Sequence, residues 1–465
     1  MKATRAIQRA RKGVNGLSRS RTHTNTLVRA VSSTAVTRTY TPASASSPGR
    51  PNCLALPSTP QIQNRRTYAS TSEGPLNRTP LYDLHLEYGA KMVPFGGFDM
   101  PVQYSGLSVS ASHHFTREKA SLFDVGHMVQ HMFSGPGATD FLESITPSSL
   151  STLPAHQSTL SALLWPETGG IVDDTVITRL SPLLFYVVTN AACRDKDLKY
   201  LSEQLAAWNG REVKHEIQDG WGLIALQGPL SAELLESILV SPEDVKLKEL
   251  YFGQSRFAKV KGGQHKVLIS RGGYTGEDGF EISISPDDTV PVTQTLLESA
   301  GPEKLQLAGL GARDSLRLEA GMCLYGHDLD DTTTPVEGGL SWIVGKDRRA
   351  GPNKFHGSDV ILSQLTPKSK GGAGVSRRRI GLIVEGAPAR EGAEIVDEAG
   401  ENIGVITSGC PSPTLGKNIA MGYIKDGLHK SGTEVQVKVR GKARKAVVSK
   451  MPFVPAKYWK GTAPA

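Results

Sequence analysis

The sequence predicts an α+β protein that ends in a small all-β domain, and two observations carry this prediction. From Pro80 to about Gly345, strand and helix patterns alternate irregularly, as in α+β proteins. From Ile380 onward, about six short strand patterns follow closely between turn-forming segments, which is typical of a small sandwich or barrel. Leu365–Arg379 is rich in Gly, Ser and basic residues and indicates a linker. The predicted organisation is a leader at 1–68, an α+β domain at 75–345, a linker at 346–379 and a β-domain at 380–460.

The first 72 residues have the composition of an import signal. They hold twelve Lys or Arg and no Asp or Glu, and they are rich in Ser and Thr. Mitochondrial targeting segments share this composition. Arg66 stands three residues before a candidate cleavage point that follows Tyr68. We therefore expect a presequence at 1–68 that directs the protein to the mitochondrial matrix.

The net charge of +8 for the whole chain comes from this leader. Without residues 1–72, the chain has 41 basic and 45 acidic residues, a net charge near −4. Binding of nucleic acid through a basic surface is therefore not expected. No apolar run of about eighteen residues is present, so no membrane span is expected either. Beyond the leader, Cys193, Cys323 and Cys410 lie far apart without a CxxC motif, which argues against a zinc site or a disulfide framework.

Within the α+β part, hydrophobic periodicity marks the elements. Asp195–Trp208 is predicted to be a helix, because Leu198, Leu201 and Leu205 recur on one stripe. Further predicted elements are helices at Ser231–Leu239 and Gly311–Ala320 and short strands at Phe185–Val188 and Leu223–Leu226.

Two strands joined by a glycine-rich turn are predicted for Val267–Ser285. Side chains alternate along a strand, so Phe280 and Ile282 point to one face and Glu281 to the other. A carboxylate beside a glycine turn can accept two N–H bonds from a flat, nitrogen-rich ligand, and Tyr274 in the turn offers a stacking face. The alternative is a solvated glutamate on an antiparallel strand.

A pair of aspartates lies in the strand-like segment Gly169–Ile177. Alternation puts Asp173 on the face of Ile171, Thr175 and Ile177, and Asp174 on the opposite face. A carboxylate among apolar neighbours is desolvated, which brings its pKa toward the range useful for acid–base chemistry. The alternative is that the aspartate only ends the strand.

Several segments stand in the order found in the aminomethyltransferases (T-proteins) of the glycine cleavage system, which this chain resembles from about Pro75 to Tyr458. The segments are Phe95–Tyr104, Ser121–Met128, Gly169–Ile177, Val267–Ser285, Gly309–Asp328, Thr407–Tyr423 and Ala446–Pro455. The resemblance implies three subdomains around a central folate-binding opening, with the C-terminal barrel as the third. It also names residues 75–345 as the folate-binding domain.

The resemblance also implies the site residues. It makes Asp173, the first of the pair, the catalytic residue, whose role as a base, an orienting group or a charge stabiliser stays open. The folate-binding positions that it implies are Glu281, Arg313, Tyr423, Tyr274 and Asn190. Without the resemblance, Arg313 could be a surface cation on a helix, Tyr423 a core residue and Asn190 a helix cap.

The implied reaction transfers the methylene carbon of an S-aminomethyldihydrolipoyl carrier to tetrahydrofolate and releases ammonia. Tetrahydrofolate is the expected co-substrate, no metal is expected, and the expected partner is the lipoyl carrier (H-protein). This carrier is expected to dock near Arg379, which ends the basic run Arg377–Arg379. The alternative for that run is a solvated face.

Two related functions compete with this one. The folate-binding half of a sarcosine or dimethylglycine dehydrogenase would need a flavin domain, and the sequence has no strand–GxGxxG–helix unit. A folate-binding iron–sulfur assembly factor of the same fold would carry a cysteine in the glycine turn, where this chain has Tyr274 and Thr275.

Overall fold

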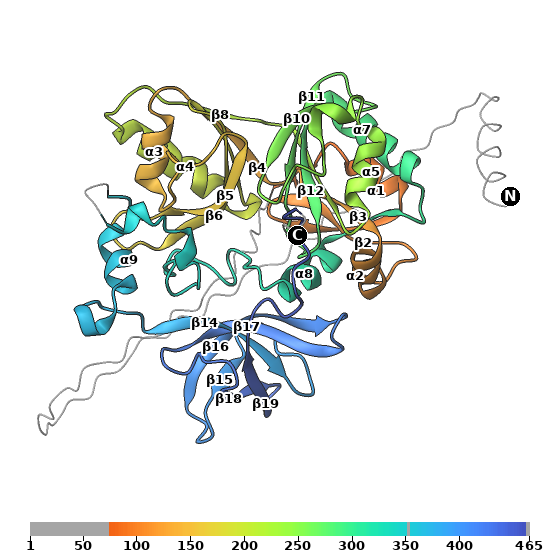
Figure 1. The fold of residues 1–465 in the computed structure, drawn as a ribbon. Helices are drawn as coiled ribbons and strands as arrows, with labels where there is room; N and C mark the ends of the chain where they lie inside the picture. The colour runs from red at the N-terminus through yellow and green to blue at the C-terminus, as the bar shows by residue number, and fades with distance from the viewer. Residues whose placement is uncertain (1–73, 351–353, 462–465) are drawn as a thin grey trace, which may run out of the picture. The chain divides into compact units, whose positions relative to one another are not determined.

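The structure, a computed structural model, describes residues 74–350 and 354–461 (Figure 1). The presequence predicted at 1–68 lies outside these residues. In the described part of the chain, no helix combines the length and the apolar character needed to cross a membrane.

The first large sheet is antiparallel and has the strand order β5-β6-β7-β4-β8. Its strands are β4 (Val129–Ser134), β5 (Gln157–Leu164), β6 (Ile171–Ser181), β7 (Leu184–Thr189) and β8 (Lys214–Ile217). Two helices, α3 (Ala138–Ile145) and α4 (Arg194–Ala207), pack on one face, where Phe141 and Leu201 meet Phe185. The predicted strand at Phe185–Val188 and the predicted helix at Asp195–Trp208 are confirmed.

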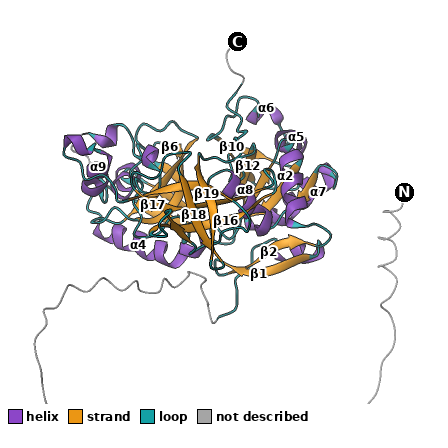
Figure 2. Ribbon diagram, turned by 90° about the horizontal axis from the view of Figure 1, so that it is seen from below, coloured by secondary structure: helices purple, strands orange, loops and turns teal. Residues whose placement is uncertain are grey.

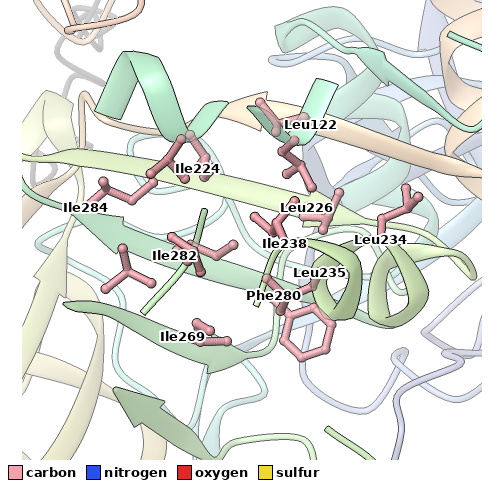
Figure 3. Packing of buried hydrophobic residues seen from close by; sticks show 14 of the residues in the cluster. Leu122, Ile224, Leu226, Leu234, Leu235, Ile238, Ile269, Phe280, Ile282 and Ile284 are labelled. Carbon is pink, nitrogen blue, oxygen red and sulfur yellow. The ribbon is translucent and has the colours of Figure 1, made fainter. Parts of the chain in front are cut away.

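The second sheet has the order β10-β11-β12-β9-β3-β13, with only the β3–β13 pair parallel. Its strands are β3 (Ala120–Asp124), β9 (Gly222–Gln227), β10 (Ser255–Lys259), β11 (Lys266–Arg271), β12 (Gly279–Ile284) and β13 (Leu305–Leu307). Helices α5 (Ser231–Ile238) and α7 (Pro286–Ala300) cover one face. Figure 3 shows Phe280 and Ile282 of β12 in the core beside Leu235 of α5, as the predicted alternation requires.

The C-terminal part is a closed six-stranded barrel with the order β14-β17-β16-β15-β18-β19. The ring closes because β14 pairs with both β17 and β19. Its strands are β14 (Arg377–Val384), β15 (Glu394–Val396), β16 (Asn402–Ser412), β17 (Lys417–Lys425), β18 (Glu434–Val439) and β19 (Lys442–Ser449). The chain is thus a mixed helix and sheet protein that ends in a barrel, as predicted.

The segment predicted as a linker, residues 346–379, has more structure than its composition indicates. It contains helix α9 (Ser358–Leu365), whose Ile361 is fully buried in a core cluster with Leu340. The first barrel strand also begins three residues early, at Arg377 rather than Ile380. The Gly- and Lys-rich composition is therefore confined to the short connection between α9 and β14. Helix α9 itself is part of the fold, because its apolar side packs in the core.

One helix connects these parts. Helix α8 (Leu310–Glu319) packs against α2 (Val109–Glu118), against β2 (Phe98–Tyr104) and against the barrel strands β16 and β17. Its Arg317 donates to Ser408 Oγ of the barrel at 3.0 Å. Figure 2 shows β1 (Ala90–Phe95) and β2 as a separate two-stranded ribbon. The remaining short helices are α1 (Tyr82–Glu87), α6 (Pro242–Val245), η1 (Ala191–Cys193), η2 (Ser341–Ile343), η3 (Asp347–Arg349) and η4 (Lys368–Lys370).

Candidate active site

Glu281 of β12 lies where the two sheets meet. Its neighbour Ser283, on the same face of the strand, donates to Gln130 Oε1 of the first sheet at 2.6 Å, and Tyr186 donates to the same oxygen at 2.8 Å. Glu281 is half-buried, and burial raises the pKa of its carboxyl group while the charge of Arg313 lowers it. Within the described part of the chain, no donor is bonded to the Glu281 carboxylate. The Glu281 carboxylate therefore has no donor from the described chain, and its role in binding a ligand stays a prediction.

Arg313 of α8 is a half-buried cation without a full set of partners. Its guanidinium carbon lies 4.7 Å from the centre of the Tyr274 ring, a cation–π distance. Its Nη1 is buried and makes no hydrogen bond to any described residue. Burial lowers the pKa of Arg313, and the nearby charge of Glu281 raises it. Arg313 is thus packed against Tyr274, and Arg317, one turn further, is buried and forms an ion pair with Asp328 at 2.7 Å.

The glycine turn fixes Tyr274 beside Arg313. Gly273 has φ +152°, and a Cβ added there would come within 2.1 Å of Gln227 Oε1, so the position requires glycine. Gln227 in turn donates to the carbonyl of Gly272 at 2.9 Å and accepts from Thr275 Oγ1 at 2.7 Å. At the far end of its ring, the Tyr274 hydroxyl donates to the carbonyl oxygen of Cys323. The aromatic face is thus held at both ends.

Asp173 and Asp174 lie on opposite faces of β6. In the pairing with β5, a β-bulge lies between Ile171 and Asp173. Val172 packs in the core cluster under α3 and α4, whereas Ile171 packs in the separate cluster that contains Leu340. Asp173 stands opposite Leu163, which belongs to the cluster under these helices, and it is 0% exposed. Asp174 is half-buried on the other face.

Asn190 holds both carboxylates. Its backbone N–H donates to Asp173 Oδ2 at 2.7 Å, and its side-chain amide donates to Asp173 Oδ1 and to Asp174 Oδ1, each at 2.9 Å. The residue directly precedes helix η1, as a cap would, but it makes no side-chain cap bond there. Asn190 is therefore a clamp for the aspartate pair.

Of the two aspartates, Asp174 is the one that acts electrostatically on Tyr274. Burial raises the pKa values of the Tyr274 phenol and of Cys323, and the charge of Asp174 adds to both shifts. Burial and the charge of Asp173 raise the pKa of Asp174 to about 7. For Asp173, burial and the charge of Asp197 hold the pKa well above its ordinary value. Asp173 thus lies on the face of the strand that α4 covers, and its catalytic role stays a prediction.

Tyr423 lies where the barrel meets the loop after α8. Its hydroxyl donates to the carbonyl of Asp328 at 2.6 Å, and the Arg377 guanidinium lies 4.7 Å from its ring centre. The residue is only 4% exposed, and burial raises its pKa. The structure thus brings Tyr423 near Asp328 and Cys323, but Arg377 lies over its ring.

The basic run Arg377–Arg379 is neither a solvated face nor a free charged patch, because all three side chains are half-buried and bonded. Arg378 forms an ion pair with Asp426 at 2.5 Å. Arg379 donates to the carbonyls of Gly338 at 2.7 Å and Gly321 at 3.1 Å. Arg379 therefore connects the first barrel strand to the loops at Gly321 and Gly338. Docking of a carrier near Arg379 stays a prediction.

One acidic residue near the site was not predicted. Asp197 of α4 is fully buried, and one of its carboxylate oxygens, one of Asp173 and Cys193 Sγ lie within 4.8 Å of one another. The sequence carries a weak signal for it, since Asp197 shares the buried stripe of α4 with Tyr200 and Leu201 at helical spacing.

A cavity of about 220 Å³ lies apart from the predicted site residues. Its lining includes Arg78, Phe98, His127, Arg194 and Trp221. None of the predicted ligand-binding side chains lines this cavity.

Comparisons with known proteins give a consistent result over both parts of the chain. Residues 81–348 match the family described as "GCVT N-terminal domain", and residues 377–455 match the "Glycine cleavage T-protein C-terminal barrel domain". The "Probable aminomethyltransferase, mitochondrial" of Schizosaccharomyces pombe is 52% identical over 396 residues, which are 85% of this chain and 97% of that protein. The "Aminomethyltransferase, mitochondrial" of Mus musculus is 45% identical over 406 residues, covering 87% and 96% of the two chains.

A solved structure is similar as well. It is the glycine cleavage system aminomethyltransferase T from Bartonella henselae, with a TM-score of 0.73 and 37% sequence identity. The similarity covers 83% of this chain and 100% of that one.

Proposed function

The chain belongs to the glycine cleavage T-protein family and is an aminomethyltransferase, and on this premise we propose how its residues perform the transfer. The reaction is the transfer of a methylene carbon from the S-aminomethyldihydrolipoyl carrier protein to tetrahydrofolate, with release of ammonia. The observation that carries the assignment of the site is the set of incompletely bonded polar groups around Tyr274. These groups are the Glu281 carboxylate, Nη1 of Arg313 and the Asp174 carboxylate.

Tetrahydrofolate fits the donor and acceptor groups that are free. The Glu281 carboxylate can accept the two N–H groups on the amino-pyrimidinone edge of a pterin. Arg313 Nη1, buried without a partner, can donate to the pterin carbonyl oxygen, and the Tyr274 face lies beside it. Binding folate would therefore satisfy buried polar atoms that the chain itself leaves unbonded, which is a source of specificity.

In the reaction, the methylene carbon exchanges its bonds to sulfur and to the amino nitrogen for two bonds to folate nitrogens. The protons released by the folate nitrogens leave on ammonia and on the dihydrolipoyl thiol. Holding the folate nitrogen against the thioaminal carbon supplies much of the rate enhancement. Asp174, with a pKa of about 7, can accept and return a proton at neutral pH.

We therefore move the catalytic assignment from Asp173 to Asp174. The support is the 0% exposure of Asp173 and its place under α4, against the half-buried position of Asp174 on the face toward Tyr274. In this proposal, Asn190 orients Asp174 rather than binding folate directly, because its amide is already bonded to both carboxylates. Tyr423 supports the loop at Asp328 through its hydroxyl.

The partner in this proposal is the lipoyl carrier, because the reaction requires an aminomethyl group on its lipoyl arm. Docking near Arg379 stays a prediction. Its bonds to Gly321 and Gly338 indicate that Arg379 would act by holding these loops in place, not as an exposed charge. The protein is mitochondrial, like the relatives it matches, and the matrix is the compartment that we propose.

The experiment that tests the function is tetrahydrofolate-dependent release of ammonia from an aminomethylated lipoyl carrier, with each substrate omitted in turn. Ammonia release that requires both substrates supports the proposal. Folate binding without any turnover would instead favour the folate-binding assembly factor considered above.

A further inference from the structure

A closed acidic cluster lies behind Asp174, on the other face of β6. Asp173 and Asp197 are both 0% exposed. Asp173 has donors for both oxygens, since Asn190 bonds Oδ2 at 2.7 Å and Oδ1 at 2.9 Å. Asp197 has none, because neither of its oxygens has a donor in hydrogen-bond geometry among the described residues. The cluster therefore contains a buried carboxyl group whose partner must be found within the cluster itself.

The charges around this cluster do not allow both carboxyl groups to ionise. Two carboxylates that share a buried site repel each other, and one of them holds a proton. The cation that acts on Asp197 is Lys196, but its side chain is 26% exposed and its ammonium group already bonds Tyr325 at 2.6 Å and Asp331 at 3.1 Å. One proton between Asp173 and Asp197 would give Asp197 its missing donor and remove one of the two charges.

We propose that Asp197 is a positioning residue for the aminomethyl transfer: it shares a single proton with Asp173, and the pair keeps one negative charge against the amide of Asn190, behind Asp174. The geometry supports this chain of contacts. One carboxylate oxygen of Asp197 lies within 4.8 Å of one of Asp173, and the Asn190 amide bridges Asp173 to Asp174 with two hydrogen bonds of 2.9 Å. The inference rests on the proposed role of Asp174.

The charge of the pair acts on Asp174 across the strand. A neighbouring negative charge disfavours ionisation, so the pair keeps Asp174 in a range where it exchanges protons at neutral pH. The hydroxyl of Thr189, which contacts His131 at 3.1 Å, favours the charged form of Asp197 without reaching hydrogen-bond geometry. The titratable groups that face the pair are Asp174 of β6, Cys193 of η1, Lys196 and Tyr200 of α4, and Tyr325 of the loop after α8.

The first test observes the proton directly. Infrared spectroscopy of protein labelled with ¹³C-aspartate distinguishes a protonated carboxyl group from a carboxylate by its carbonyl band. In the Asp174→Asn background, where Asp174 cannot contribute, we expect this band to be present at pH 7. Adding Asp197→Asn should remove it, because the new amide N–H replaces the shared proton and leaves Asp173 ionised. Absence of the band before that second substitution would overturn the proposal.

The second test measures how the negative charge of the Asp173–Asp197 pair affects the pH dependence of kcat. The Asp197→Asn variant keeps one negative charge, on Asp173, whereas the double variant Asp173→Asn/Asp197→Asn keeps none. The acid limb of the profile should therefore stay within about half a pH unit of wild type in the single variant and move to lower pH by about one unit in the double variant. Equal shifts in both variants would contradict a shared charge, even if turnover falls in each.

Two further outcomes separate this inference from its rivals. One equivalent of a bound metal ion in the isolated protein, lost on Asp197→Asn, would show that the cluster holds a cation instead of a proton and would overturn the proposal. Loss of ammonia release in Asp174→Asn tests the proposed function and leaves the infrared result untouched. The infrared measurement needs no activity, so it remains decisive if the double variant folds poorly.

Discussion

Asp173 and Asp174 are adjacent in the chain, yet the first is 0% exposed under α4 and the second is half-buried on the face toward Tyr274. One strand thus gives two neighbouring carboxylates different environments.

Asp174→Asn should fold and bind tetrahydrofolate but lose turnover by about two to three orders of magnitude, because an amide is nearly isosteric and cannot accept a proton. Asp173→Asn is the matched control, and it should lose less turnover while lowering stability, since its amide cannot accept both N–H bonds from Asn190. The measurements are ammonia release and thermal unfolding. A larger loss of turnover in Asp173→Asn would return the catalytic role to that residue.

The rate of transfer should rise as Asp174 loses its proton, so kcat is expected to increase with pH through about 7 and then level off. The same limb should be missing from the residual rate of Asp174→Asn. The measurement is the pH profile of ammonia release with both substrates saturating. A limb that survives in the variant would belong to a different group.

Stability should also depend on pH through Asp197. Its folded pKa is raised to about 7 from an ordinary value of 3.8, so the neutral form stabilises the folded protein fully below pH 4. This contribution is lost as pH rises through about 7. Between pH 5 and pH 8, the free energy of unfolding of wild type should fall relative to that of Asp197→Asn by on the order of 1–2 kcal/mol. Parallel curves from chemical denaturation would contradict the shifted pKa.

Glu281→Gln should weaken tetrahydrofolate binding about ten- to hundredfold, because the new NH₂ group opposes a pterin N–H and leaves a polar mismatch of roughly 1–3 kcal/mol. Affinity for the lipoyl carrier should change little. Glu303→Gln, at an exposed position, is the control and should bind folate like wild type. Titration calorimetry with folate and with carrier separates the two effects, and unchanged folate affinity in Glu281→Gln would move the pterin site elsewhere.

A chain that lacks residues 1–68 should fold and retain activity, because the match to the family begins only at residue 81. It should no longer enter isolated mitochondria, since the acid-free basic segment is gone. Import of the full chain and the truncated chain, with protease protection as the readout, makes the comparison. An inactive truncated chain would indicate that the leader contributes to the fold.

Features that depend on local order along the chain could be predicted from the sequence. The alternation of Phe280 and Ile282 on β12, the stripe of α4 and the six closely spaced barrel strands are periodic patterns, and backbone geometry converts them directly into structure. The glycine turn could also be predicted, because a positive φ at Gly273 is a requirement of the local backbone.

Which side of each element packs against which neighbour could not be predicted, because it depends on contacts between distant segments. Alternation separates Asp173 from Asp174, but the covering of one face by α4 determines which carboxylate is sealed, and no local pattern encodes that packing. The sequence indicates a free charge at Arg379, but in the folded protein the carbonyls of Gly321 and Gly338 accept its N–H groups. No local pattern sets Asp197 apart from the other polar residues of its helix. Folding brings one of its carboxylate oxygens within 4.8 Å of one of Asp173, which lies 24 residues earlier in the chain. Burial and proximity between distant segments change the charge of a side chain, and they exist only once the chain has folded.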